Sequence, residues 1–389
     1  KAIFGEKHAR TAHALKSHAY HMRANRRYKE ATTLLRESQM VFFAAQGANS
    51  ISRLGVLYTL AKLEIKLGRL VSATANLRIA LGGYESTLGA QSDQALKVTS
   101  ILGAVLTWQG GLDEAQALLV PALEQRRSSL GPAHGQTVRL QLNLARLRIA
   151  QGDLRTAHIL MNQARLSRVA SLGREHPKTL IAILLQSGVL LGLGRLEEAH
   201  DLAEFAYDEF VKEVGSTDSR SLLAGHTLAC VLIQRGRISK AEKLLRECRD
   251  RSEIGHTASF VGTFLLPDEV SITSTLAMLL HMRGNVEMKR RWSNKDELNP
   301  KLLADRMHTE AERMYLHVLH TLEAAVGAAD AMVVMSTMNL AQLEMDRREP
   351  AKAIKLLRRA ISVNETVRGK TDIVTFAACT KLAMALSAE

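Results

Sequence analysis

The segment ARLRIAQGDLRTA, residues 145–157, decides the fold. It joins two apolar stretches through the turn Gln151-Gly152-Asp153, and its glycine returns every 42 residues along the chain. The glycines of this series are Gly68, Gly110, Gly152, Gly194 and Gly236. Self-similarity at a fixed period of this size is typical of stacked supersecondary units, so the sequence predicts a repeat array.

Further series of small residues keep the same step. The alanines five residues after each glycine are Ala73, Ala115, Ala157, Ala199 and Ala241. The small residues seven positions before each glycine are Ala61, Gly103, Ala145, Ser187 and Ala229. A second glycine series comprises Gly5, Gly47, Gly89, Gly131, Gly173 and Gly215. Only small side chains let two helix axes approach closely, so we expect the small residues before each turn to be buried where paired helices cross.

One repeat shows how the helices are placed. Apolar residues over 138–149 predict a first helix, and those over 157–169 predict a second. Gly152 can adopt the left-handed conformation that ends a helix, and Asp153 can cap the helix that follows. Gly173 closes the second helix in the same way. The repeat is therefore a helix pair.

The repeat resembles the tetratricopeptide repeat, and more narrowly the 42-residue repeat of kinesin light chains. The resemblance rests on Leu144-Ala145, Gly152, Ala157, Ala164, Leu172-Gly173, His176-Pro177 and Thr179. It implies an all-α, right-handed superhelical solenoid of about eight helix pairs plus a terminal helix. The heptad segment of a kinesin light chain is not seen, so the resemblance concerns the repeat and not motor function.

The period divides the chain into three parts of one continuous solenoid. Residues 1–251 hold regular repeats, 252–306 form an irregular repeat with two insertions, and 307–389 resume the period. One insertion is predicted near Gly255–Pro267. The other is predicted within Asn285–Arg306, as a 22-residue excursion from the helix pair with a short helix at Pro300–Arg306. Both chain ends fall inside a repeat, so we expect the array, and any targeting peptide, to extend beyond this sequence.

Composition limits the possible functions. The net charge of +13 favours polyanionic partners or a basic protein of an organelle matrix. Cys230, Cys248 and Cys379 lack metal-ligand spacing and are expected to be reduced thiols. No apolar run is long enough to span a membrane, and no catalytic signature occurs. The sequence thus predicts a protein that is not an enzyme, with no cofactor, no metal and no small-molecule substrate.

The resemblance also implies which residues line the concave groove, because the first helix of each tetratricopeptide pair faces it. Carried over position by position, the first four repeats present a basic and aromatic set: His13, Lys16, Tyr20, Arg23, Tyr58, Lys62, Lys66, Lys97, Trp108, Arg139 and Arg146. Later repeats present an apolar set: Leu184, Leu223, Cys230, Ile233, Met278, Met282, Met335, Met338 and Met345. The second insertion adds Lys289, Arg290, Arg291 and Trp292 as contact residues that are expected to be ordered only in an assembly.

Each set has two interpretations. The basic set can bind an acidic segment or a phosphate backbone, or it can be a solvated helix face. The apolar set can receive a partner helix, or its side chains can fill the core. With only 4% aromatic residues, any RNA contact is expected to be to the backbone.

Two functions follow. The first is a non-catalytic structural subunit of a large assembly, such as the mitochondrial ribosome, that contacts other protein subunits and RNA backbone in the mitochondrial matrix. The alternative is a cytoplasmic adaptor that takes acidic peptide motifs in its groove.

Overall fold

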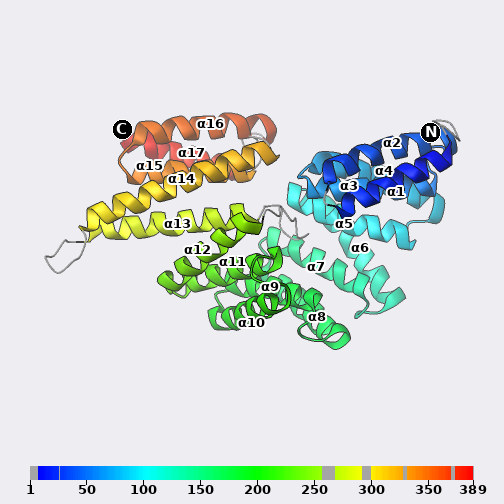
Figure 1. The fold of residues 1–389 in the computed structure, drawn as a ribbon, viewed down its shortest axis with the longest axis horizontal. Helices are drawn as coiled ribbons and strands as arrows, with labels where there is room; N and C mark the ends of the chain where they lie inside the picture. The colour runs from blue at the N-terminus through cyan, green and yellow to red at the C-terminus, as the bar shows by residue number, and fades with distance from the viewer. Residues whose placement is uncertain are drawn as a thin grey trace. The chain divides into compact units, whose positions relative to one another are not determined.

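The computed structural model describes residues 8–25, 27–255, 268–290, 299–326, 331–368 and 373–388. Every regular element in these ranges is an α-helix (Figure 1). Two compact units are present, residues 1–209 and 210–389, with the boundary inside helix α10 (Leu196–Val214). Among the described helices, none is both long and apolar enough to cross a membrane.

Consecutive helices pack in pairs. The helices before α10 are α1 (Ala9–Ala24), α2 (Tyr28–Gln46), α3 (Ile51–Lys66), α4 (Leu70–Leu88), α5 (Asp93–Gln109), α6 (Leu112–Leu130), α7 (Gly135–Ala150), α8 (Leu154–Leu172) and α9 (Pro177–Gly192). Those after it are α11 (Ser219–Gln234), α12 (Ile238–Gly255), α13 (Asp268–Lys289), α14 (Pro300–Val326), α15 (Ala331–Asp346), α16 (Pro350–Arg368) and α17 (Ile373–Ala388). Within the first unit α1 packs on α2, α3 on α4, α5 on α6 and α7 on α8, and each of these pairs also packs on the first helix of the pair that follows. The described chain therefore has the predicted eight pairs plus a terminal helix.

The turn glycines adopt the conformation that the sequence predicts. Gly68, Gly110 and Gly152 have φ of 72°, 83° and 80°, a region that residues with a Cβ rarely occupy. Arg348 takes the equivalent position between α15 and α16 and has φ of 63°. The backbone shape of the turn is thus kept even where glycine is absent.

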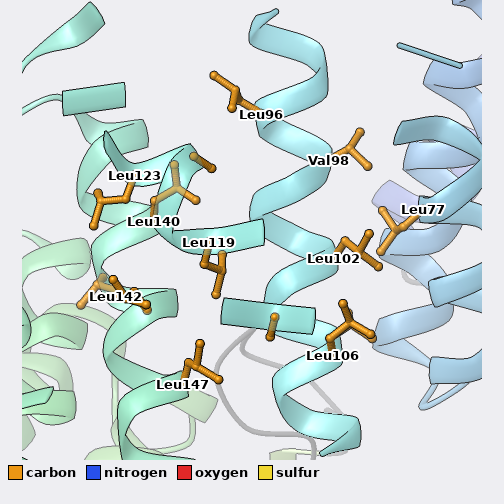
Figure 2. Close-up of a cluster of buried hydrophobic side chains, with 14 of the residues drawn as sticks. Leu77, Leu96, Val98, Leu102, Leu106, Leu119, Leu123, Leu140, Leu142 and Leu147 are labelled. Atoms are coloured by element: carbon orange, nitrogen blue, oxygen red, sulfur yellow. The ribbon is translucent and has the colours of Figure 1, made fainter. Parts of the chain in front are cut away.

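The crossing positions are buried as predicted. Ala61, Ala145 and Ser187 are each 0% exposed. Gly103 is also buried, and a Cβ added to it would lie 2.5 Å from Cγ of Leu119. Leu119 belongs to the apolar cluster that runs from α3 to α9 in the first unit, part of which Figure 2 shows. Small residues are therefore required where the paired helices cross.

The residue before the first helix supplies its N-cap in each of the first six pairs. His176 precedes α9, and its Nδ1 accepts a hydrogen bond of 3.1 Å from the backbone N–H of Lys178. The same 42-residue position is occupied by His8, Ser50, Ser92, His134 and Asp218, and each side chain accepts a backbone N–H of the helix it precedes. Residues with a side-chain acceptor are favoured at this position because they satisfy an otherwise unpaired N–H.

The second insertion differs from the prediction. The excursion was expected to leave the helix pair from Asn285, but α13 continues through Gly284 and Asn285 to Lys289. Residues 300–306, expected as a separate short helix, form the first turns of the 27-residue α14. The insertion thus lengthens both helices of the pair, which run side by side (Figure 1). Arg291, Trp292 and most of the first insertion lie outside the described residues.

Candidate partner-binding surface

Four cations predicted from the groove positions converge in the first unit. Arg23 lies on α1, Lys62 and Lys66 lie on α3, and Arg139 lies on α7, and all four side chains are exposed. Desolvation, followed by the charges of Arg23, Arg139 and Lys66, lowers the pKa of Lys62. The charges of Arg23, Lys66 and Arg139 therefore lie near enough to Lys62 to act on it. We call these four residues the cationic face.

Tyrosine rings support these cations. The ammonium of Lys62 lies 5.4 Å from the ring centroid of Tyr58, and that of Lys66 lies 5.2 Å from the ring centroid of Tyr28. On α1, the Arg23 guanidinium lies 5.0 Å from the Tyr20 ring. A cation–π contact of this kind contributes about 0.5–1 kcal/mol at an exposed site. The rings hold the cations in place but leave their charge unneutralised.

Lys16 shares the ring of Tyr20, with its ammonium 5.7 Å from the centroid. Tyr28 lies on α2 and was missed because the sequence argument considered only the first helix of each pair.

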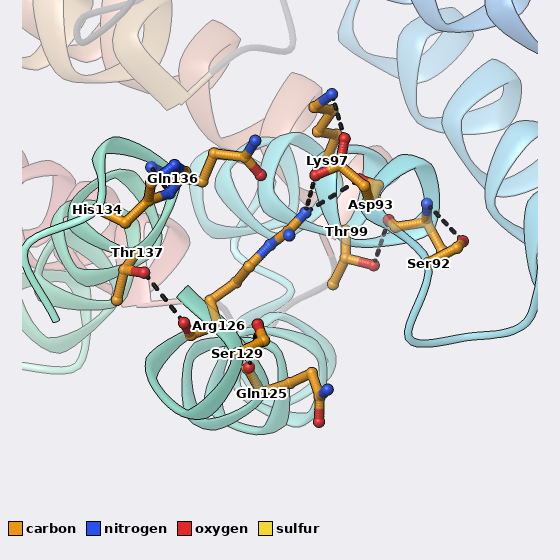
Figure 3. A network of polar contacts seen from close by, with 11 residues as sticks. Ser92, Asp93, Lys97, Thr99, Gln125, Arg126, Ser129, His134, Gln136 and Thr137 are labelled. Carbon is orange, nitrogen blue, oxygen red and sulfur yellow. Dashed lines mark hydrogen bonds and ion pairs between the residues drawn. The ribbon is translucent and has the colours of Figure 1, made fainter. Parts of the chain in front are cut away.

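Lys97 is not a free cation of the groove. It forms an ion pair with Asp93, whose carboxylate Oδ1 also accepts a 2.6 Å hydrogen bond from Arg126 (Figure 3). Arg126 is only 5% exposed and also donates to the Asp93 carbonyl at 3.1 Å. Hydrogen bonding from Lys97, together with Arg126, lowers the pKa of Asp93. This network joins α5 to α6 and has a structural role, so Lys97 is removed from the candidate binding set.

Two other predicted groove residues pack against the protein itself. The ring of His13 lies edge-on to the buried ring of Phe42, with centroids 4.9 Å apart. Trp108 is half-buried and packs against the apolar cluster of the first unit. These contacts stabilise helix packing.

A second basic group lies on α7 and α8. Burial, followed by the charge of Arg168, lowers the pKa of Arg146 to about 10. Burial and the charge of Arg139 likewise lower the pKa of Arg168 to about 10. We call Arg139, Arg146 and Arg168 the arginine cluster. Arg168 was missed because it lies on α8, the second helix of its pair.

The apolar set divides between surface and core. Met278, Met282 and Met335 are 40%, 51% and 56% exposed. Met338 is 8% exposed and packs with Val334 and other core residues, so it does not line a groove. Leu184 is also buried, whereas Leu223, Cys230, Ile233 and Met345 are half-buried. The sequence assigned the two buried residues to the wrong side of their helices.

Cys230 is the one thiol among the predicted groove residues. Its Sγ lies 3.7 Å from Nε2 of His226, which also lies 2.8 Å from Oγ1 of Thr275. Burial raises the pKa of Cys230 to about 11 and lowers the pKa of His226 to about 4. Both groups are therefore neutral at pH 7, and the pair does not hold the thiolate that nucleophilic chemistry needs.

Among the described residues, no group of three or more His, Cys, Asp or Glu side chains is placed to hold a metal ion.

Models of the tetratricopeptide repeat family match residues 94–165 and 333–372. The chain therefore contains tetratricopeptide repeats. The glycine positions of its structure keep the 42-residue period that the sequence showed. The comparison with curated proteins finds no match.

Several solved structures are similar to this chain. Kinesin light chain TPR-like repeats from Podosopora anserina are 24% identical, with 52% of this chain and 95% of that chain covered and a TM-score of 0.45. A Rap protein complexed with competence and sporulation factor is 13% identical over 98% of both chains, with a TM-score of 0.51. An IFIT1 monomeric mutant with Gppp-AAAA is 13% identical over 95% of this chain and 77% of that chain, with a TM-score of 0.53. At these identities the likeness concerns the fold alone.

Proposed function

We propose that this tetratricopeptide repeat protein is a non-catalytic scaffold within a larger assembly, and that its cationic face binds an acidic segment of a partner protein. The observation that carries the proposal is that the charges of Arg23, Lys66 and Arg139, which come from three helices, act on Lys62. Like charges held close together raise the free energy of the unbound protein. An acidic segment removes that repulsion and gains charge-assisted hydrogen bonds.

The tyrosines favour a protein partner over single-stranded RNA. Non-specific binding of single strands uses aromatic faces on which bases stack. Here the faces of Tyr20, Tyr28 and Tyr58 are covered by cations of the protein itself. An extended acidic peptide needs only the cations, which remain accessible.

The finer expectations rest on composition. The net charge of +13 supports an organellar ribonucleoprotein, such as the mitochondrial ribosome, as the assembly. Contact with RNA backbone and a mitochondrial location stay predictions.

A titration with two probes tests the proposal. The probes are a fluorescein-labelled peptide of twelve alternating Glu and Ala residues and a labelled twelve-nucleotide single-stranded RNA. Each is titrated into the full chain, into the triple variant Arg23→Gln, Lys62→Gln, Lys66→Gln, and into the control Lys29→Gln, Arg69→Gln, Arg155→Gln. The control loses the same charge from exposed positions outside the cationic face.

We expect the peptide to bind the full chain and the control alike, and the triple variant at least 10-fold more weakly. Equal binding by both variants would show that the cationic face is only a solvated surface. Tighter binding of the RNA, with a slope of log affinity against log salt of about −0.7 per phosphate contacted, would replace the protein partner with a nucleic acid.

A further inference from the structure

Hydrogen bonds within the protein orient two side chains of the arginine cluster, Arg146 and Arg168. Nη1 of Arg146 donates a 2.9 Å hydrogen bond to Oδ1 of Asn143, which is 6% exposed. Nδ2 of Asn143 in turn donates to the carbonyl and Oγ of Ser100 on α5, at 2.8 Å and 3.1 Å. Arg146 is thus oriented by a buried amide that is anchored in the neighbouring repeat.

The second arginine is also tied to the backbone. Nη1 of Arg168 donates to the carbonyl of Lys178 at the start of α9. The Nε of Arg146 is shielded from solvent and has no hydrogen-bond partner. A buried donor left unpaired costs free energy, so the site holds an unused hydrogen-bond donor beside two positioned guanidinium groups.

The cluster lacks the counter-charges that Arg126 and Arg246 have. Arg126 is paired with Asp93, and Arg246 with Glu310. Within the described residues, Arg139, Arg146 and Arg168 make no ion pair, and their charges act on one another. Desolvated cations without a counter-charge are unfavourable unless a ligand supplies one.

We propose that Arg139, Arg146 and Arg168 bind one phosphoryl group, carried by a phosphorylated side chain of the acidic segment. The inference rests on the proposed function, because that segment is the one that the cationic face binds. A phosphoryl group brings a charge of about −1.5 to −2 and three acceptor oxygens, which match several guanidinium forks. A carboxylate brings one charge and two oxygens, and would leave two of the three cations unpaired.

The test compares three peptides of one acidic sequence that carry Ser, Glu or phosphoserine at the central position. For the full chain we expect the phosphoserine peptide to bind at least 10-fold tighter than the Ser peptide, and also tighter than the Glu peptide. The double variant Arg146→Gln, Arg168→Gln should lose this preference, with a ratio near one. Arg146→Lys keeps the charge but not the planar fork, and should lose most of the preference.

Two controls separate the effects. Arg155→Gln removes an exposed cation of α8 and should leave the ratio unchanged. The triple variant of the cationic face should weaken all three peptides equally and keep the ratio. Helical circular dichroism confirms that each variant is folded.

The outcomes distinguish this inference from the proposed function. If the peptides bind through the cationic face but phosphoserine is no better than Glu, or if the double variant keeps the preference, the phosphoryl site is refuted and the proposed function stands. If no peptide binds, inorganic phosphate is titrated by calorimetry. Phosphate binding at one site that requires Arg146 and Arg168 would then keep the site and refute the peptide function, and no phosphate binding would refute both.

Discussion

Replacing Gly103 with alanine tests the steric rule that sets the period of the fold. The new Cβ would lie 2.5 Å from Cγ and 2.6 Å from Cδ2 of Leu119, where carbon atoms normally stay about 3.5–4.0 Å apart. Leu119 is 0% exposed and belongs to the apolar cluster, so a shift of about 1 Å would have to be taken up by the buried residues around it. Overpacking of this kind costs about 1–3 kcal/mol, and the better helix propensity of alanine returns about 1 kcal/mol. We expect a net destabilisation of about 1 kcal/mol.

Gly188 provides the matched control. It lies within α9, also the first helix of a pair, and an added Cβ would meet nothing within 4 Å. Gly188→Ala should therefore stabilise its helix by about 0.5–1 kcal/mol. Repeat arrays open locally, so the assay is native-state amide hydrogen exchange, read in α5 and α6 for Gly103→Ala and in α9 for the control. Equal stabilisation by the two substitutions would refute the account of helix crossing.

Three further predictions concern caps, pH and thiols. His176→Ala should lower the free energy of opening of α9 by about 0.5–2 kcal/mol. His176→Ser should be near neutral, because Ser50 at the equivalent position caps α3. Amide exchange in α9 measures both variants, and an equal loss of stability in the two would argue against capping. The folded pKa of His226, about 4, lies below its ordinary value of 6.5, so the unfolded state takes up the proton first. Stability should be full above pH 6.5 and fall towards pH 4, by up to about 3 kcal/mol, and His226→Gln should remove this part of the pH dependence in urea unfolding. Iodoacetamide at pH 8 should modify the exposed Cys379 well before Cys248, because burial raises the pKa of Cys248 to about 11. Mass spectrometry of the native protein gives the order of modification, and equal rates would contradict the burial of Cys248.

The helix pairs could be predicted because their causes are local. Gly152 is needed for a left-handed turn and Ala157 for a close approach of two helices, and both requirements repeat with the period. The capping role of the inter-repeat position was missed, although the signal was present. Histidine, serine and aspartate alternate at His176 and its 42-residue equivalents, and what they share is a side-chain acceptor.

At the second insertion the 42-residue period did not predict the secondary structure. Spacing located the extra residues but could not tell a loop from a longer helix. The choice depends on packing across the pair: Gly284 lies against the ring of His308, which only a helical Gly284 without a side chain allows. That contact joins two residues from opposite sides of the insertion.

The candidate site could be predicted only in part. Repeat positions gave Arg23, Lys62 and Arg139, because the first helix of each pair repeats the same orientation. They could not give the pairing of Lys97 with Asp93, which depends on side-chain reach within the fold. Nor could they give Arg168, because it enters the arginine cluster from the second helix of a pair.

Site-specific photo-crosslinking tests the central claim most directly. The photoreactive residue benzoylphenylalanine replaces Lys62 on the cationic face or, as control, Arg155 on α8, and the assembly is irradiated in cells before mass spectrometry. The account predicts that position 62 crosslinks to an Asp- and Glu-rich segment of a partner protein and that position 155 does not. Crosslinks from position 62 to nucleotides, or the same crosslinks from both positions, would contradict it.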